Sequence, residues 1–271
     1  MENTELIILL KHIIIGLVQG FTEPIPVSSS GHVMIASHLL GMGEQGFTFA
    51  ILTNTASLVA ICFIYRKDII RLIIHTCYYI KSKNPIYYAD FKFAMFVIIG
   101  SIPAGVLGIL FSDVISSNIG MTTIAITLFI TGIALWLIRN LQGSKRDEDL
   151  TVKDASIIGL GQAVALIPGI SRSGATVITA LAIGMQRETA LRFSFMLYIP
   201  VSLGGVILGT SNFLAEPQKA NLFIPYLATF VATLFMTYFS MKWFIGVLKN
   251  GKLVYFSYYC FIVGTLILIF L

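Results

Sequence analysis

The sequence predicts an all-helical protein that crosses a membrane several times. Of its 271 residues 56% are hydrophobic and only 11% are charged, with a mean hydropathy of +0.87. A soluble domain carries about 25% charged residues. Six uninterrupted apolar stretches approach the ~20 residues that a helix needs to cross the hydrocarbon core. Two further apolar regions are interrupted, so we predict six transmembrane helices plus two re-entrant helix pairs.

The predicted elements follow one another along the whole chain. The six spans cover residues 46–65, 93–111, 119–138, 193–210, 222–241 and 253–271. The interrupted regions are 6–42 and 155–185, and each is predicted to enter and leave the membrane on one face. The start, MENTE, is acidic and lacks the basic region of a secretory signal peptide. Residues 6–21 are therefore expected to remain in the mature protein.

The two interrupted regions resemble each other. Without a gap, residues 16–31 and 159–174 share six of sixteen positions: Gly16/Gly159, Leu17/Leu160, Gln19/Gln162, Ser28/Ser171, Ser30/Ser173 and Gly31/Gly174. Each copy contains a proline and precedes an apolar helix of about ten residues and then a full span. The sequence thus predicts one membrane domain, 1–271, built from two repeats. These are 1–138 with motif 16–32 and 155–271 with motif 159–176, joined by a loop at 139–154.

Basic residues orient the two copies. They cluster in segments 66–92 and 139–153, whereas the connection 112–118 has none. Because cytoplasmic loops carry an excess of Lys and Arg, both basic segments are predicted to be cytoplasmic. The spans that follow the two motifs then run in opposite directions, and both termini lie outside. This pattern predicts an inverted-topology repeat whose interrupted helices meet near the bilayer midplane and form a binding site.

Composition argues against other classes of protein. The net charge of +5 comes from basic residues in the loops between spans, so topology explains it and no nucleic-acid partner is expected. The three cysteines show no metal-ligand or redox spacing. We expect them to be packing residues in or beside apolar segments: Cys62, Cys77 and Cys260.

The first motif, TEPIPVSSSGH at 22–32, places polar chemistry within apolar sequence. Gln19 and Glu23 are four residues apart and share one face of a helix. Pro24 disfavours a helical conformation for the residue before it, so Glu23 should end that helix. The serines that follow can cap the returning helix, and His32 comes directly after them.

The second motif, ALIPGISRSGA at 165–175, should also break and restart a helix. Helix starts expose unpaired N–H groups and the positive end of the dipole, which together bind anions. Arg172 adds a planar fork of donors suited to phosphate oxygens. A charge so deep in a membrane usually has a function. The candidate phosphate-binding residues are Ser28, Ser171, Arg172 and Ser173.

Each candidate has a purely structural alternative. Arg172 could pair with Glu23 as a bridge between the repeats, although a buried ion pair is weak evidence of stabilisation. The serines could be caps and nothing more, and His32 could be satisfied by a backbone carbonyl. Glu23 has no cationic neighbour in sequence, so it requires Arg172, a metal ion or both.

These motifs carry a resemblance to a known family. QGFTEPIPVSSSGH and PGISRSGAT resemble the two signature motifs of the undecaprenyl-diphosphate phosphatases, or bacitracin-resistance proteins, and RETALRFSFMLYIP at 187–200 resembles the segment after the second. The resemblance implies a multi-pass enzyme of the bacterial inner membrane that hydrolyses the C55 lipid diphosphate and recycles the carrier for wall polymers. It also implies a homodimer and an active site open to the periplasm.

The family's site residues match positions in this chain. Its acidic pair falls on Gln19 and Glu23, and its catalytic serine and histidine on Ser29 and His32. Its phosphate-binding arginine and threonine fall on Arg172 and Thr176.

Two positions depart from the family pattern. Gln19 stands where many members have glutamate, and ILTNTASLVA at 51–60 has Asn54 and Ala56 where the family usually shows glutamine and glycine. Metal affinity is the property that these departures put in doubt.

The resemblance also suggests how the residues would act. A diphosphate needs positive charge around it and stabilisation of the departing group. Arg172, the second helix start and a divalent cation, Mg²⁺ or Ca²⁺, held by Glu23 and Gln19 would supply both. His32 is a candidate for proton transfer or nucleophilic attack, and Ser29 is the competing nucleophile with His32 as its base. The sequence leaves this choice open.

Two other functions share some of these features. Lipid phosphatases of the phosphatidic-acid type 2 family share Ser-Gly-His and Ser-Arg motifs, but they need a histidine after the Ser-Arg motif, and the last histidine here is His75. That architecture is excluded. Inverted repeats with broken helices are typical of transporters, so a flippase for polyprenyl phosphate that uses the same anion site remains the alternative.

Overall fold

The computed structural model describes residues 3–43, 46–110, 120–167, 169–215 and 222–271, and the regular secondary structure within these ranges is helical apart from one isolated bridge. The all-helical prediction is confirmed. The helices are α1 (Asn3–Thr22), α2 (Ser29–Leu39), α3 (Phe47–Ile64), α4 (Arg66–Ser82), α5 (Tyr88–Leu110), α7 (Met121–Ile138), α8 (Val152–Val164), α9 (Arg172–Ala182), α10 (Arg187–Ala215), α11 (Phe223–Lys249) and α12 (Val254–Phe270).

Among the described residues, five helices are long and apolar enough to cross a membrane, and a sixth candidate is the pair α3 and α4, which bend by 75° at Tyr65. The five windows are Glu5–Thr22, Pro85–Leu110, Met121–Ile138, Arg187–Gly209 and Phe223–Lys249. Helix α12 is apolar but shorter, with 17 residues. Helix α1 is predicted to be a limb of a re-entrant pair, and this role stays a prediction. Its window has the length and composition of a span because only Glu5 and Lys11 are charged in it.

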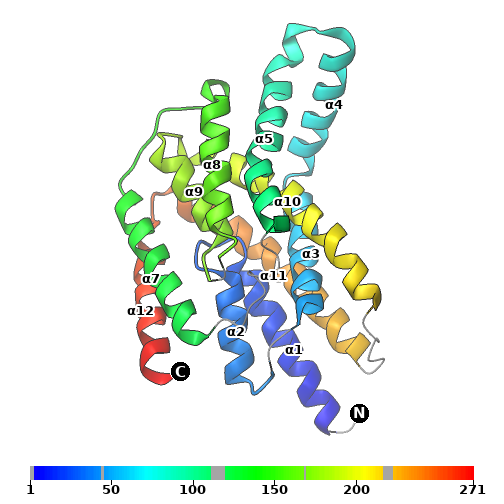
Figure 1. The fold of residues 1–271 in the computed structure, drawn as a ribbon, viewed down its shortest axis with the longest axis vertical. Coiled ribbons are helices and arrows are strands. Elements are labelled where there is room, and N and C mark those ends of the chain that lie inside the picture. Colours follow the sequence, from blue (N-terminus) through cyan, green and yellow to red (C-terminus); the bar gives the residue numbers. More distant parts are fainter. Residues whose placement is uncertain (1–2, 44–45, 111–119, 168, 216–221) are drawn as a thin grey trace.

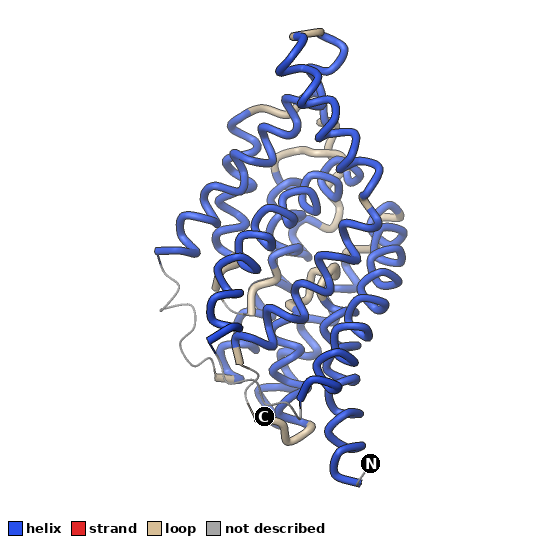
Figure 2. Tube along the Cα trace, turned by 90° about the vertical axis from the view of Figure 1, so that its right-hand side faces the viewer, coloured by secondary structure: helices blue, strands red, loops and turns tan. Residues whose placement is uncertain are grey.

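The two termini and the basic connections lie at opposite ends of the molecule. Both termini lie at one end in Figure 1 and Figure 2, and the hairpin of α4 and α5 projects from the other end together with the connection from α7 to α8. The basic segments 66–92 and 139–153 therefore lie at the end opposite the termini. Ion pairs join them there, because Arg192 contacts Asp147 and lies 3.5 Å from Asp68.

Both interrupted regions form two helices joined by a break, as the motifs predict. Helix α1 ends at Thr22, directly before Glu23, and α2 restarts at Ser29 with Ser28 as its cap. In the second copy α9 starts at Arg172, and its cap Ser171 accepts a hydrogen bond from an amide three residues on. The predicted capping role of the serines is confirmed for these two.

The first broken pair is fixed to α11 by close backbone contact. The hydroxyl of Thr233 donates to the carbonyl of Gly16 over 3.0 Å, and that of Ser240 donates to Phe21 over 2.5 Å. A Cβ at Gly20 would come within 2.5 Å of the Thr233 carbonyl, so only glycine permits this approach. The contacts set the position of the chain immediately before the first break.

In each broken pair we call the break and the first turn of the helix after it the tip: the first tip joins α1 to α2, and the second joins α8 to α9. The two tips meet each other halfway along the molecule (Figure 1). Gly174 of α9 lies so close to the first break that a Cβ there would be 3.2 Å from the Cβ of Pro26. Helix α8 is held behind the second tip by α5, because a Cβ at Gly159 would be 2.4 Å from the carbonyl of Gly100. Two motifs far apart in sequence thus face each other, while the opposite orientation of the copies stays a prediction.

Candidate active site

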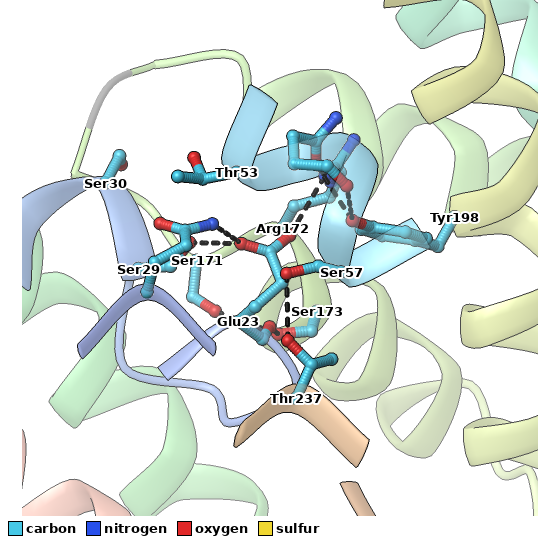
Figure 3. A network of polar contacts seen from close by, with 12 residues as sticks. Glu23, Ser29, Ser30, Thr53, Ser57, Ser171, Arg172, Ser173, Tyr198 and Thr237 are labelled. Atoms are coloured by element: carbon cyan, nitrogen blue, oxygen red, sulfur yellow. Dashed lines mark hydrogen bonds and ion pairs between the residues drawn. The ribbon is translucent and has the colours of Figure 1, made fainter. Parts of the chain in front are cut away.

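The centre of the candidate site is an ion pair between the two motifs. Arg172 Nη2 lies 3.2 Å from Glu23 Oε1, with 7% of the Glu23 side chain and 25% of the Arg172 side chain exposed. Figure 3 shows this pair at the centre of a network of polar side chains. The structural alternative, a bridge between the copies, is therefore present as a contact. The surrounding groups show what else the pair can do.

The first motif surrounds the Glu23 carboxylate with donors. Oε2 accepts from Gln19 Nε2 over 2.7 Å and from Ser29 Oγ over 2.6 Å. The four-residue spacing places Gln19 and Glu23 on one helix face, and the break returns the chain so that Ser29 starts α2 beside them. The hydroxyl proton of Ser29 thus points at a carboxylate that can accept it.

The second motif contributes the cation and a tie between the tips. The Ser171 cap sets the start of α9, which makes Arg172 its first residue. The hydroxyl of Ser173 lies 3.2 Å from the carbonyl oxygen of Glu23 and 3.3 Å from that of Ile25. Its single proton is shared between these two acceptors, and this contact holds the second tip against the first break.

Two residues of the network were not among the candidates, Asn54 of α3 and Tyr198 of α10. Arg172 Nη2 and the Tyr198 hydroxyl both donate to Asn54 Oδ1, over 3.1 and 2.8 Å. The Arg172 guanidinium also lies 4.3 Å from the centre of the Tyr198 ring, a cation–π contact. The available signal was the group of polar residues within an apolar span at Thr53, Asn54 and Ser57. Nothing in the sequence singled out Tyr198.

Arg172 keeps donors for a ligand. Within the described part of the chain, both of its side-chain hydrogen bonds start from Nη2. A guanidinium has five N–H groups, so those on Nε and Nη1 can bind phosphate oxygens while the pair with Glu23 persists.

His32 turns away from the ion pair. Its Nδ1 lies 2.8 Å from the carbonyl oxygen of Ser28, and its Nε2 lies 2.7 Å from the hydroxyl of Tyr259 in α12. Among the described residues it has no hydrogen bond to Ser29 or Glu23. The expected bond to a backbone carbonyl is therefore present at Nδ1. Nε2 bonds instead to Tyr259, a side chain that the sequence did not indicate.

Comparison with known proteins assigns the chain to a family. Residues 12–266 match the family model described as bacitracin resistance protein BacA. The chain is 52% identical over 268 residues to a Bacillus licheniformis protein named undecaprenyl-diphosphatase 1, covering 98% of this chain and 99% of that one. It is 54% identical to a protein of that name from Bacillus cereus, over 97% of each chain, and 49% identical to an undecaprenyl-diphosphatase from Oceanobacillus iheyensis, again over 97% of each.

This chain belongs to the BacA family. The match includes both breaks and the segment that carries Tyr198, so every contact of the network described above lies inside it. The resemblance seen in the motifs is confirmed.

The remaining candidates of this BacA-family member serve the helix starts. The Thr176 hydroxyl donates to the carbonyls of Arg172 and Ser173, over 3.1 and 3.2 Å. Ser28 Oγ accepts from the amide of Gly31 over 3.3 Å, and Ser171 Oγ from that of Gly174 over 3.0 Å. All three side chains therefore shape the backbone that presents Ser29 and Arg172.

The oxygen atoms beside Glu23 fit a divalent cation that arrives with a phosphate group. The described residues contain no group of three or more His, Cys, Asp or Glu side chains that could hold a metal alone. The Gln19 nitrogen faces the carboxylate, so the amide would have to turn to offer its oxygen to a cation beside Glu23. Mg²⁺ is commonly bound by one or two carboxylates plus substrate phosphates, and the BacA site offers this kind of donor set.

Proposed function

We propose that this protein hydrolyses undecaprenyl diphosphate to undecaprenyl phosphate and inorganic phosphate. The activity would recycle the lipid carrier for cell-wall synthesis and confer bacitracin resistance. The observation that carries the proposal is that Ser29, Glu23 and Arg172 meet at the contact between the two tips. Full-length relatives about half identical to this chain are named undecaprenyl-diphosphatases, which supports the same reaction.

Substrate binding would begin at Arg172. The diphosphate carries several negative charges, and the Nε and Nη1 donors of Arg172 would bind oxygens of the terminal phosphate. The dipole of α9 adds positive potential at the same point, because Arg172 is the first residue of that helix. Tyr198 and Asn54 would hold the guanidinium in place.

Ser29 is our proposed nucleophile. Its Oγ attacks the terminal phosphorus as its proton passes to Glu23 Oε2, and the bond from that phosphorus to the bridging oxygen breaks, so the lipid monophosphate leaves. Water then hydrolyses the phosphoserine, releasing inorganic phosphate, and Glu23 returns the proton to Ser29. Attack by His32 is the competing route. A trapped phosphoenzyme distinguishes them, since phosphoserine is acid-stable and phosphohistidine is acid-labile.

A divalent cation, Mg²⁺ or Ca²⁺, is proposed as cofactor. When bound it would neutralise charge on the phosphates. Glu23 and the amide oxygen of Gln19 would hold it. Where many members of the family have a second carboxylate, Gln19 lowers the negative charge of this site, and we expect cation binding to be correspondingly weak.

The chain is a multi-pass membrane protein, and we propose that it lies in the bacterial cytoplasmic membrane with its site open to the outer face. The position of the basic connections at the end opposite the termini supports this orientation (Figure 1). Homodimerisation and contact with bilayer lipid are part of the same proposal.

Phosphate release by the purified protein in detergent tests the function. We expect release from undecaprenyl diphosphate with a cation present, and Arg172→Lys to lower kcat/KM about 10²-fold because lysine lacks the fork of donors. The control is Arg139→Lys, at an arginine that caps the carbonyl of Trp136 at the end of α7. No release, together with translocation of the monophosphate in liposomes, would instead establish a flippase, an alternative that the names of the relatives do not support.

A further inference from the structure

Tyr259 of α12 contacts the histidine of the first motif from outside both broken helix pairs. Its hydroxyl lies 2.7 Å from His32 Nε2, and the two rings stack with centroids 5.5 Å apart and an angle of 15° between their planes. His32 is 8% exposed, whereas Tyr259 is 41% exposed. The tyrosine thus lies between a buried imidazole and the surface of the molecule.

The other ring nitrogen determines which way the proton of this contact points. His32 Nδ1 is 2.8 Å from the carbonyl oxygen of Ser28, and a carbonyl can only accept. Nδ1 therefore carries the hydrogen, and in the neutral imidazole Nε2 has the free lone pair. The Tyr259 hydroxyl must then donate to Nε2.

Helix α12 holds Tyr259 in a defined place. The hydroxyl of Ser257 donates to the carbonyl of Gly132 in α7 over 2.6 Å. A Cβ at Gly132 would be 2.8 Å from the Phe261 ring, so the two helices approach closely around this bond. Ser257 and Phe261 flank Tyr259 on the same helix, and their contacts fix its backbone relative to α7.

We propose that Tyr259 is the positioning residue of His32. The Ser28 carbonyl sets the Nδ1–H tautomer, and the Tyr259 hydroxyl orients Nε2, the ring atom with the free lone pair. Between turnovers the phenol covers Nε2, and it withdraws when a phosphate or water takes its place. On the Ser29 route His32 Nε2 would take the proton of the water that hydrolyses the phosphoserine, and on the competing route it would attack phosphorus itself. Both roles need the Nε2 lone pair, so the assignment holds for either.

This inference rests on the proposed phosphatase function, and its first test is kinetic. Tyr259→Phe keeps the ring and removes only the hydroxyl. We expect kcat to fall about 10-fold, less than the roughly 10²-fold that follows loss of a donor touching the reacting group itself, with KM changed less than 2-fold because Tyr259 does not bind the phosphates. The matched control is Tyr258→Phe, at a neighbouring tyrosine that is 52% exposed, which should keep wild-type values.

The second test needs no substrate. Diethyl pyrocarbonate acylates an unprotonated imidazole nitrogen, and peptide mass spectrometry reads its rate at His32 separately from the other histidines. With Nε2 covered in the wild type, we expect at least a 5-fold faster rate at His32 in Tyr259→Phe and an unchanged rate in Tyr258→Phe. Thermal midpoints and gel filtration of both variants establish that each is folded.

The outcomes separate the two proposals. An unchanged His32 rate in folded Tyr259→Phe overturns the positioning role, as does an equal loss of kcat in both variants. If the wild-type protein releases no phosphate, the proposed function fails, but the acylation rates still decide whether Tyr259 covers His32. If the lower kcat of Tyr259→Phe is accompanied by a lower thermal midpoint, Tyr259 is a packing residue. That result also contradicts the proposal.

Discussion

The two tips of the molecule use one capping scheme for opposite chemistry. In each, a serine accepts a hydrogen bond from the glycine amide three residues on, Gly31 for Ser28 and Gly174 for Ser171. The first tip carries a carboxylate, and the second places Arg172 directly after its cap. The shared scheme sets where the helices restart, while the charges have diverged so that the tips attract each other.

The helices that lead to the two tips, α1 and α8, also differ in their polar contacts. Gln19 at the end of α1 bonds to Glu23, whereas its counterpart Gln162 in α8 is 1% exposed and neither of its amide atoms bonds to any residue that the structure describes. Four residues after Gln162 the chain has Leu166 in place of an acid. The acidic chemistry of the site therefore belongs to the first copy alone.

Backbone strain distinguishes the tips as well. Ser28 has φ 68° and ψ 94°, whereas Ser171 has φ −70° and ψ 119°. A non-glycine residue at positive φ costs on the order of 1–3 kcal/mol and is found most often at functional sites. The Ser28 carbonyl accepts from His32, so the strained residue of the pair is the one that orients a candidate catalytic side chain.

The largest effect is expected at the acid of the first tip. Glu23→Gln removes the acceptor for the Ser29 proton and leaves Arg172 without its counter-charge. We expect kcat/KM to fall about 10³-fold or more, measured as phosphate release. Glu5→Gln, at the exposed start of α1, is the control. Activity of Glu23→Gln within 10-fold of wild type would contradict the division of roles between the tips.

Local rules predicted most of what lies within each tip. The break at Pro24, the serine caps and the single face shared by Gln19 and Glu23 follow from contacts over a few residues. Pairing of Glu23 with Arg172 is one of the alternatives that the sequence leaves open, because a buried carboxylate requires Arg172, a metal ion or both. The repeat therefore indicated both the elements of the site and their meeting point.

Contacts between distant helices could not be predicted in this way. Asn54 and Tyr198 bond across 144 positions, and His32 and Tyr259 across 227. The bond from His32 Nδ1 to Ser28 is local, but the partner of Nε2 depends on where α12 packs, which no local pattern encodes. The re-entrant role of α1 also stays a prediction, since its apolar length and composition would equally suit a span.

The start of α8, the helix that leads to the second tip, is held by a buried carboxylate. Asp154 at the start of α8 is 4% exposed and accepts from Lys145 Nζ over 2.8 Å and from the Thr151 hydroxyl over 2.7 Å. Burial raises the pKa of Asp154, but the hydrogen bonds from Lys145 and Thr151 outweigh it and hold the pKa below its usual value. This stabilisation is complete above the unfolded pKa of about 3.9, and it is lost as pH falls through the lower folded pKa.

Asp154→Asn should therefore destabilise the protein at pH 7 by about 1.5–3 kcal/mol, and its thermal midpoint should approach that of the wild type below pH 4. Glu148→Gln, at an exposed position of the same connection, is the control. If the difference in thermal midpoint between Asp154→Asn and the wild type stays constant from pH 7 to pH 3, packing, and not the charge of Asp154, anchors α8.

The smallest expected effect is a difference in thermal stability between glycine substitutions at the two caps, Ser28 and Ser171. Glycine at a helix cap costs only a few tenths of a kcal/mol relative to serine, but at positive φ it relieves about 1–2 kcal/mol that an L-residue carries there. Ser28→Gly should therefore raise the thermal midpoint or leave it unchanged, whereas Ser171→Gly should lower it slightly, because Ser171 has no strain to lose. Scanning calorimetry of both variants in one detergent measures the difference. If Ser28→Gly is the less stable of the two, the positive φ of Ser28 is not a source of strain, and the first tip differs from the second in charge alone.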